Sequence, residues 1–543
     1  MLTQSIIFSR VRIRQYMSDR ICLGERIRGL SGIWSNGMDV GAGRWRRWGL
    51  VGVALLGSCS GGAPAESLHL ATAPGATVPT PEAGVIVHLF EWTWPDIAQE
   101  CERVLGPQGY QAVQISPPQE HVIVPELGFP WWQRYQPVSY QLISRSGDRA
   151  QLADMVQRCR AVGVEVYADV VINHMAAIDS APGSAGTIFR RYHYPGLYGS
   201  ADFNHCQQSI RDYQNADEVT QCELVGLPDL NTALPSVQGQ LADYLVDLAS
   251  LGIAGFRIDA AKHIRSEELA AILQQVRDRL DADPFIYQEV IDPGTEAIKK
   301  HDYYEAGHVI DFEYGRLVGE AFLNAGDRSP ADLLEALSIA DLVPSQQAVV
   351  FIDNHDKQRG HGGGGNYVTY QSGDLHTLAM VFMLAYPYGQ PRIMSSYAFE
   401  TSDQGPPATA AGRTRTVYSP DRLGCGGEWV CEHRQPEIMA MVAFRAATQE
   451  QSTVTDWWSN GSNQIAFGRG DRGFVVINRE STTLTHTFQT QLPAGDYCEV
   501  MSAEIQANGD CDRVITVDET GQFRTTVAAM SAIALHQAAL IHE

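Results

Sequence analysis

The sequence predicts an α/β fold: a (β/α)8 TIM barrel with an inserted domain after its third strand and a C-terminal all-β sandwich domain. Three observations predict it. Short β-rich runs alternate with amphipathic helical patterns over residues 84–447, as expected for a barrel of strand–helix units. Residues 175–230 are too long for an ordinary strand–helix loop. Residues 448–543 hold short apolar runs punctuated by Gly and Asn, which is typical of a sandwich.

The length and composition describe a soluble globular protein of two or three domains. The chain has 543 residues, of which 44% are hydrophobic and 19% charged, and its formal net charge is −23. Residues 1–58 contain nine Arg, no Lys and three acidic residues, which gives +6, and the remainder therefore carries −29. An acidic body argues against nucleic acid or an anionic membrane as a partner and suits a neutral substrate.

The first 59 residues form an N-terminal extension with an export signal. An Arg-rich run at 44–48 precedes the apolar run 49–56, which is too short to span a bilayer, and small residues follow. Cys59 comes directly after them, so the segment resembles a bacterial lipobox, in which this Cys is acylated and becomes the mature N-terminus. We therefore expect export, with a lipid anchor at Cys59 that would hold the protein at the cell surface or outer membrane.

An alternative is an ordinary signal peptide that is cleaved near Ala65 and releases an extracellular protein. Residues 1–37 fit neither interpretation, which leaves Met38 as an alternative start. Residues 60–83 are rich in Ala, Pro, Thr and Gly and lack a periodic apolar pattern, so they read as a flexible linker.

The barrel strands and helices follow in order from residue 84. The first strand, 84–90, is an apolar run, and amphipathic helices are expected at 94–105 and 149–162. The insertion at 175–230 has Gly, Pro, Tyr and its own pair of cysteines, which suggests a small domain. The further strands are expected at 112–116, 165–172, 255–259, 285–288, 309–312, 348–353 and 391–395.

Eight of the ten cysteines lie beyond the targeting segment and form local couples. In an exported chain this favours disulfides over free thiols or a metal cluster. Cys22 and Cys59 belong to the targeting segment. The other eight are Cys101 and Cys159, on two expected barrel helices, and Cys206 with Cys222, Cys425 with Cys431 and Cys498 with Cys511, which are close in sequence.

The run GFRIDAAKH at 255–263 places charged groups at the end of a short strand. Arg257 and Asp259 are two residues apart, so their side chains share one face of the strand. A charged pair on a strand otherwise built from Gly, Phe and Ile is costly to bury. The pair is therefore either functional or a structural Arg–Asp bridge.

Three more β-rich runs end in polar residues, as expected where barrel strands deliver catalytic groups to their C-terminal loops. They are DVVINH at 169–174, YQEV at 287–290 and FIDNHD at 351–356. In order and spacing, the four motifs resemble the signature regions of the α-amylase family of glycoside hydrolases. The resemblance covers roughly residue 84 to the C-terminus and is closest to the animal-type, chloride-dependent branch. It also implies that the eight cysteines pair in sequence order.

The resemblance implies that Asp259 is the nucleophile, Glu289 the general acid/base and Asp356 the carboxylate that binds sugar hydroxyls and stabilises the transition state. A retaining glycosidase needs one ionised and one protonated carboxyl group about 5–5.5 Å apart. Arg257 beside Asp259 should keep Asp259 ionised, whereas Glu289 has no cation next to it in sequence and is free to hold the proton. The alternative is that the three carboxylates only cap strands.

Substrate-binding residues are expected around these acids. His174 and His355 each adjoin an Asn at a strand end and, in the family, donate hydrogen bonds to the sugar. The run PWWQRYQP at 130–137 offers aromatic surface for stacking on pyranose rings, and its prolines favour a loop over core packing. From this run we expect Trp131, Trp132, Tyr135 and Gln136 in the cleft, and elsewhere Tyr213, Arg257, Lys262, His263, Ile291 and His361.

The run GHGGGG at 360–365 lacks the GK[ST] ending of a phosphate-binding loop. It resembles the mobile glycine-rich loop that closes over substrate in animal-type amylases. Simple surface flexibility is the alternative.

Two ions are implied by the resemblance, Ca²⁺ and chloride. The calcium ligands would be the Asn173 side chain, the Asp229 carboxylate, and the backbone carbonyls of Thr220 and His263. For His263 we expect the carbonyl and not the imidazole ring to bind the ion. Oxygen ligands of this kind suit Ca²⁺ better than zinc. Animal enzymes commonly carry another residue in place of Thr220, but only its carbonyl is used. Chloride would be bound by Arg257, Asn354 and Arg392, unless Arg392 only forms an ion pair within the barrel.

These observations predict an exported, monomeric α-amylase that cleaves internal α-1,4-glucosidic bonds in starch, glycogen and maltooligosaccharides. The mechanism would be a double displacement with retention of anomeric configuration. A transglycosylase with the same carboxylates is one alternative, and linear rather than cyclic or lengthened products would exclude it. A non-catalytic glucan-binding surface protein is another, although such proteins usually lose a catalytic carboxylate and none is missing here.

Overall fold

The computed structural model describes residues 84–178, 181–363, 365–418, 425–502 and 511–541. The predicted signal, the Cys59 anchor and the linker 60–83 lie outside the described residues. Within the described part, no helix is both long and apolar enough to cross a membrane.

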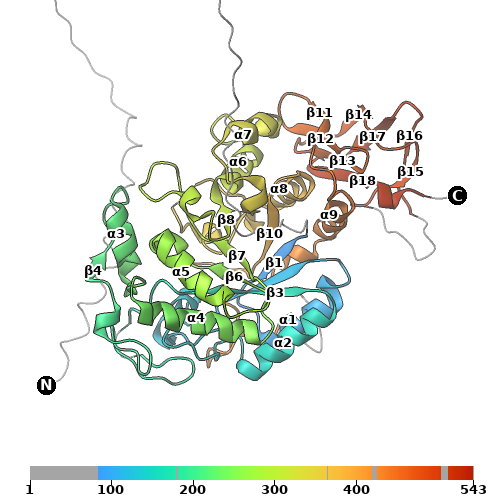
Figure 1. Ribbon diagram of the computed structural model, residues 1–543. Helices are drawn as coiled ribbons and strands as arrows, with labels where there is room; N and C mark the ends of the chain where they lie inside the picture. The colour runs from blue at the N-terminus through green and yellow to red at the C-terminus, as the bar shows by residue number, and fades with distance from the viewer. Residues whose placement is uncertain (1–83, 179–180, 364, 419–424, 503–510, 542–543) are drawn as a thin grey trace, which may run out of the picture. The chain divides into compact units, whose positions relative to one another are not determined.

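Eight parallel strands close into a barrel, as the sequence predicts (Figure 1). Each is hydrogen-bonded to its two neighbours in the spatial order β1-β2-β3-β6-β7-β8-β9-β10 and back to β1. Nearly every strand residue is buried, so both faces of the sheet are covered. The bounds are β1 Ile86–Leu89, β2 Ala112–Ile115, β3 Glu165–Val170, β6 Gly255–Ile258, β7 Phe285–Gln288, β8 His308–Asp311, β9 Ala348–Val350 and β10 Gln390–Ser395.

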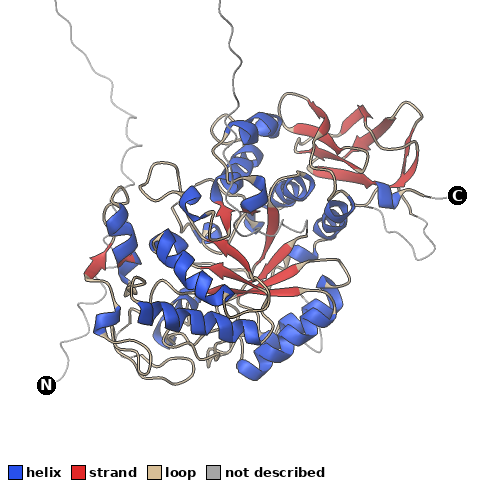
Figure 2. Cartoon of the chain, in the orientation of Figure 1, coloured by secondary structure: helices blue, strands red, loops and turns tan. Residues whose placement is uncertain are grey.

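Helices surround the barrel strands in Figure 2. In α5, for example, Leu269, Ile272, Leu273 and Val276 form one buried stripe at helical spacing. The helix α2 begins at a capping box in which Asp148 and Gln151 satisfy each other's backbone N–H groups. The helices are α1 Trp94–Glu100, α2 Arg149–Ala161, α4 Pro235–Ser250, α5 Ser266–Arg277, α6 Phe312–Leu323, α7 Leu333–Ile339, α8 Asp374–Ala385 and α9 Pro436–Ala447.

The expected helix at 94–105 changes character partway. It is α-helical to Glu100 and continues as a wider π-helical segment, Cys101–Leu105. Cys101 is disulfide-bonded to Cys159 of α2. All four disulfides that the resemblance implies are present: Cys101–Cys159, Cys206–Cys222, Cys425–Cys431 and Cys498–Cys511.

The insertion between β3 and β6 contains little regular structure. It holds β4 Cys206–Ser209, which pairs with β5 Cys222–Glu223, and the helix α3 Ala216–Gln221 between them. Its rings Phe189 and Phe203 belong to the same buried cluster as the barrel core. Part of the insertion therefore packs into the barrel core, and part of it forms a small buried cluster of its own.

The C-terminal region is an antiparallel all-β domain, as predicted. A sheet of β11 Thr455–Ser459, β12 Gln464–Arg469, β13 Gly473–Asn478 and β18 Ser531–His536 faces two strand pairs. A core that includes Phe474, Val476, Phe488 and Phe523 packs between the layers. The pairs are β14 Leu484–Gln489 with β17 Gln522–Val527, and β15 Gly495–Cys498 with β16 Val514–Val517.

Candidate active site

The motif residues meet at the C-terminal ends of neighbouring barrel strands. Ile258 and Gln288 are register partners on β6 and β7, and Asp259 and Glu289 follow them directly. Within the sheet, Arg257 on β6 lies between its register partners Asp169 on β3 and Tyr287 on β7. The barrel therefore brings together carboxylates that are 30 residues apart in the chain.

One buried guanidinium connects three carboxylates. Arg257, only 1% exposed, places Nη1 2.6 Å from Asp169 Oδ1 and 2.8 Å from Asp259 Oδ1. Its Nη2 lies 2.7 Å from Glu289 Oε1. Glu289 has no cation next to it in sequence, but parallel pairing of β6 with β7 brings it to the arginine of the neighbouring strand.

Backbone geometry also joins the two acids. Ala260, directly after Asp259, has a left-handed conformation with φ of +49°, which is rare for a residue with a side chain. Its N–H donates to Glu289 Oε2 at 2.9 Å. Strain of this kind concentrates at functional sites, where the surrounding structure maintains it.

The carboxylates oppose one another's ionisation. Burial raises the pKa of Asp259 well above its usual range, and the charges of Glu289 and Asp169 raise it further, while Arg257 lowers it. Burial and then Glu289 raise the pKa of Asp356 to about 7. The sequence argument that Arg257 keeps Asp259 ionised is therefore incomplete, since Asp169 and Glu289 contact the same arginine and their charges raise the pKa of Asp259.

Two neutral histidines border the acids. His174 Nε2 lies 2.9 Å from the Tyr135 carbonyl, and burial lowers the pKa of His174 to about 4. His355 has Nε2 3.7 Å from Asp356 Oδ2 and stacks on the Tyr135 ring with the centroids 5.1 Å apart. Burial and then Arg257 lower the pKa of His355 well below its usual value. Both rings are therefore uncharged hydrogen-bonding groups at neutral pH.

The aromatic run forms a short 3₁₀ helix, Trp131–Tyr135. Trp131 is only 6% exposed, and its indole N–H donates to the Ser402 carbonyl at 2.8 Å. Trp132 is half-buried and has the more accessible ring. Gln136 accepts a hydrogen bond from the Ala177 N–H at 3.0 Å, so its amide nitrogen is left for other partners. The run thus contributes Trp131 to the packed interior and the Trp132 ring to the accessible surface.

A second group of predicted residues gathers around Lys262. Its Nζ donates to the Ile291 carbonyl at 2.5 Å and also contacts the Glu296 carboxylate. The Nζ lies 5.1 Å from the centre of the Tyr213 ring, which in turn meets the His263 ring at 6.3 Å. Glu296 was missed by the sequence reasoning. His361 lies elsewhere, with its ring 6.0 Å from that of Trp131.

Two of the four predicted calcium ligands, Asn173 and Asp229, interact where the segment after β3 meets the insertion. Asp229 is buried, and its Oδ1 has no hydrogen-bond partner, while Oδ2 accepts from Asn204 at 2.8 Å. Burial raises the pKa of Asp229 well above its usual range, and hydrogen bonds from Asn204 and Asn173 oppose the shift. A buried carboxylate oxygen without a partner fits a bound cation.

The other two predicted ligands offer only their carbonyls. The Thr220 hydroxyl donates to the Ala216 carbonyl at 2.9 Å, and His263 Nδ1 lies 3.0 Å from the Val219 carbonyl. Their side chains are thus engaged elsewhere, as the predicted carbonyl ligation requires. No cluster of three His, Cys, Asp or Glu suited to a metal occurs among the described residues. The donor set of an amide, a carboxylate and carbonyls fits Ca²⁺.

The predicted chloride ligands include a buried donor without a partner. Arg392 is 3% exposed, and in the described part of the chain no carboxylate lies within ion-pair distance of it; its Nη1 donates to Gln114 Oε1 at 2.9 Å. The Nε of Arg257 is buried without a hydrogen-bond partner. Asn354 accepts from the Lys357 N–H at 2.8 Å. These observations fit an anion and not the alternative ion pair for Arg392.

Sequence reasoning missed a layer of polar side chains inside the barrel. Gln114 on β2 accepts from Arg392 and from the Tyr287 hydroxyl, the latter at 3.0 Å, and its amide donates to Asp169 at 3.3 Å. His88 on β1 is buried, and burial and then the charges of Arg392 and Arg257 lower its pKa well below its usual value. Each is a lone polar residue within an apolar strand, and that pattern could have identified them.

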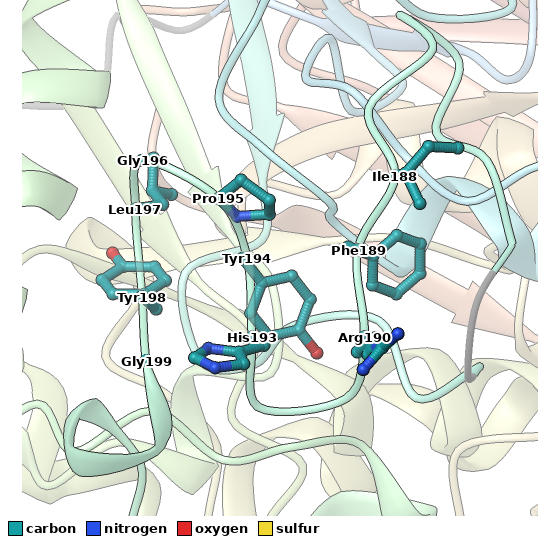
Figure 3. Close-up of a pocket in the computed structure, with 10 residues that line it drawn as sticks. All are labelled: Ile188, Phe189, Arg190, His193, Tyr194, Pro195, Gly196, Leu197, Tyr198 and Gly199. Atoms are coloured by element: carbon teal, nitrogen blue, oxygen red, sulfur yellow. The ribbon is translucent and has the colours of Figure 1, made fainter.

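A surface hollow in the insertion is lined by none of these residues (Figure 3). Its walls include Phe189, Tyr194 and Tyr198, which are at most 4% exposed because their rings pack inside the insertion. The Tyr194 hydroxyl donates to the Ala176 carbonyl at 2.6 Å. Because little aromatic surface is accessible, we assign it no role in sugar binding.

Known α-amylases are similar to this chain over most of its length. Residues 131–393 match the family described as "Alpha amylase, catalytic domain", and 457–538 match "Alpha amylase, C-terminal all-beta domain". An α-amylase from Tribolium castaneum is 47% identical over 466 residues, which are 83% of this chain and 93% of that protein. One from Thermomonospora curvata is 44% identical over 497 residues, covering 89% and 78%.

A solved structure shares the fold in detail. It is a glutamate-to-glutamine mutant of α-amylase I from Eisenia fetida in complex with maltohexaose. The two chains superpose with a TM-score of 0.78 at 39% sequence identity, over 83% of this chain and 97% of that one.

Proposed function

This chain belongs to the α-amylase family of glycoside hydrolases, and on that premise we propose that it hydrolyses internal α-1,4-glucosidic bonds of starch, glycogen and maltooligosaccharides with retention of configuration. One observation carries the proposal: Asp259 and Glu289 contact the two terminal nitrogens of the same guanidinium, at 2.8 and 2.7 Å. Two carboxyl groups held this way are adjacent, as the short separation of about 5–5.5 Å in retaining glycosidases requires.

The reaction proceeds in two displacements. Asp259 attacks the anomeric carbon while Glu289 gives its proton to the leaving glycosidic oxygen, which forms a covalent glycosyl-enzyme. Glu289 then takes a proton from water, and the hydroxide displaces Asp259. Asp356 holds sugar hydroxyls and stabilises the positive charge that develops on the ring. The neutral ring of His355 would donate a hydrogen bond to the same sugar, and His174 would do so after its Nε2–H leaves the Tyr135 carbonyl.

The remaining cleft residues bind the glucan on either side. Trp131, Trp132, Tyr135 and Gln136 would contact the sugars on the donor side. Tyr213, Lys262 and Ile291 would border the leaving part of the glucan. His361 would approach it from the glycine-rich run. Neutral glucan suits these apolar rings and hydrogen-bonding groups.

Two ions complete the proposed site. Asn173, Asp229 and the carbonyls of Thr220 and His263 would hold Ca²⁺, which would cross-link the barrel to the insertion and leave the chemistry to the carboxylates. Arg257, Asn354 and Arg392 would hold chloride, which would offset the charge of the two arginines beside the general acid.

Removal of either proposed catalytic carboxyl tests the assignment. Asp259→Asn and Glu289→Gln should each lower starch hydrolysis by about 10³-fold or more, because each removes a bond-making or proton-transferring group while nearly conserving volume. Reducing-sugar release measures the loss, and circular dichroism checks the fold. A variant that keeps more than a few per cent of activity would overturn the assignment. Linear products from the parent enzyme would separate hydrolysis from transglycosylation.

We also propose export and a domain division. The limits are 84–447 for the barrel with its insertion 175–230, and 448–543 for the C-terminal domain, and the change from parallel to antiparallel sheets supports them. Acylation at Cys59 or cleavage near Ala65 would produce different mature N-termini. Mass spectrometry of the N-terminal peptide distinguishes the two.

A further inference from the structure

Lys357 follows the proposed catalytic Asp356 directly and has no role in the mechanism above. It begins the short 3₁₀ helix Lys357–Arg359 and is 8% exposed. Its ammonium lies 4.8 Å from the centre of the Tyr367 ring and 5.4 Å from that of Phe312. The Tyr367 hydroxyl donates to the Phe312 carbonyl at 2.8 Å, which fixes the two rings relative to each other. The ammonium is thus held by aromatic faces.

The same ammonium donates a hydrogen bond to the Gly362 carbonyl. Gly362 and Gly363 have φ of +67° and +89°, a conformation that favours glycine. A Cβ atom placed on Gly362 would lie 3.4 Å from Ile291 and 3.6 Å from Asp356. One on Gly363 would lie 3.8 Å from Ile291. These two glycines therefore bridge the gap between Asp356 and the residues that follow Glu289.

This bridge borders the part of the cleft that receives the leaving glucan. Glu289 protonates the leaving oxygen in the proposed reaction, and Ile291 lies two residues beyond it. The position of Gly362 and Gly363 therefore sets one edge of the leaving-group side. Burial lowers the pKa of Lys357 to about 8, although the charges of Asp356 and Glu289 raise it. The aromatic rings and the Gly362 carbonyl stabilise the buried ammonium.

We propose that Lys357 is a positioning residue: by holding the Gly362 carbonyl it sets Gly362 and Gly363 against Ile291 and so shapes the binding site for the leaving part of the glucan. The inference rests on the proposed function and adds a residue to it. A purely structural lysine would affect stability and leave glucan affinity unchanged. A positioning residue would affect glucan affinity and KM more than kcat, because the contact stabilises the bound substrate and the transition state to the same extent.

The test compares two lysines of equal burial. Lys357→Met keeps the apolar stem among the rings and removes the donor, and Lys357→Gln keeps a neutral donor but is shorter. Lys300→Met is the matched control, since Lys300 is also 8% exposed and its Nζ donates to the Asp341 carbonyl, with the Asp341 carboxylate at 3.0 Å. Each is made in the active enzyme and in the Glu289→Gln background, where maltohexaose binding is measured by calorimetry.

Both Lys357 variants should weaken maltohexaose binding and raise KM for starch by about 10-fold, the usual effect of losing one charged hydrogen bond. The kcat should change less than about threefold, and Lys300→Met should lower Tm while leaving affinity unchanged. Affinity and KM within twofold of the parent in a folded Lys357 variant would overturn the proposal. Failure of the proposed function would look different, because Glu289→Gln itself would then remain active.

Discussion

Arg257 determines the charge balance of the site more than any other residue. Asp169, Asp259 and Glu289 all contact its guanidinium, and Asp356 lies close enough to be affected by its charge. Buried charges interact several times more strongly than exposed ones, because little water screens them. A small change in charge nearby therefore changes which carboxyl holds the proton that the reaction needs.

The first residue-scale prediction concerns chloride. Arg392 and Arg257 place two guanidinium groups beside the acids, and a bound anion would offset them and help the general acid keep its proton. Dialysed enzyme should be slower in chloride-free buffer, and its pH optimum should shift to the acid side. Arg392→Ala should weaken this response, whereas Arg524→Ala, an exposed arginine on β17, should not. Equal rates and pH profiles with and without chloride would contradict the prediction.

The second concerns Asp356, whose pKa burial and Glu289 raise to about 7. The unfolded chain ionises this group near pH 4, so the folded state binds its proton more tightly. The group's contribution to folding stability therefore falls as pH rises from about 4 to 7 and stays low above that. Asp356→Asn removes the group whose ionisation lowers folding stability as the pH rises. The Tm of this variant should therefore exceed that of the parent by about 1–3 °C at pH 8 and by less at pH 5.

Thermal melts between pH 5 and 8.5 measure the difference. Asp281→Asn, in an exposed loop, is the control and should show no trend with pH. A Tm difference for Asp356→Asn that does not grow with pH would contradict the raised pKa. The same variant should lose activity, which would illustrate that the acids are retained at the expense of stability.

At the scale of elements, the insertion depends on constraints that its own sequence does not supply. Its strands and α-helix among the described residues are α3 and the short β4 and β5, which the Cys206–Cys222 disulfide joins. The strand β3 meets it through a backbone bridge between His174 and Asp229. The proposed calcium ligands sit on both sides of this bridge, so the ion would hold the insertion to the barrel.

Chelation of calcium tests that arrangement. Binding to the native state alone stabilises it by mass action, so removal of the ion should lower Tm and make residues 175–230 sensitive to protease. Asp229→Asn should reduce the Tm difference between calcium and chelator, because it removes the charge beside the unpartnered oxygen. Melting curves and cleavage patterns that coincide with and without chelator would exclude the site.

At the scale of the whole molecule, arginines join the C-terminal domain to the barrel. Arg469 on β12 donates from Nη1 to the Ala385 carbonyl at 2.7 Å and from Nη2 to the Thr448 carbonyl at 3.0 Å. Ala385 is the last residue of α8, and Thr448 caps α9. A cation at these helix ends satisfies carbonyls that lack helical partners and favours the helix dipoles.

This contact predicts that barrel and C-terminal domain unfold together. Arg469→Met should lower Tm by at least about 3 °C, because several hydrogen bonds from a buried cation are lost and carbonyls are left without partners. Calorimetry should show one transition for the parent and a broadened or split one for the variant. Arg524→Met is the control. An unchanged Tm for Arg469→Met would show that packing alone holds the domains together.

The sequence by itself determined the barrel, the all-β domain and the positions of the motif residues. Strand–helix periodicity is local, so the runs at 255–259 and 285–288 could be recognised without a fold. The pairing of eight cysteines followed from the family resemblance and is confirmed. Polar residues that end otherwise apolar strands marked the motifs, and the family resemblance then implied the roles of Asp259, Glu289 and Asp356.

Only the tertiary structure decided which charged groups lie close enough to interact. Arg257 and Glu289 are 32 residues apart, and nothing local shows that closing the barrel brings them to 2.7 Å. The same closure assembles Gln114 and Arg392 from β2 and β10, and it brings Gly362 beside Ile291. Sequence periodicity records which face a residue occupies, whereas electrostatic energy depends on distances between strands, and those are fixed only when the sheet closes.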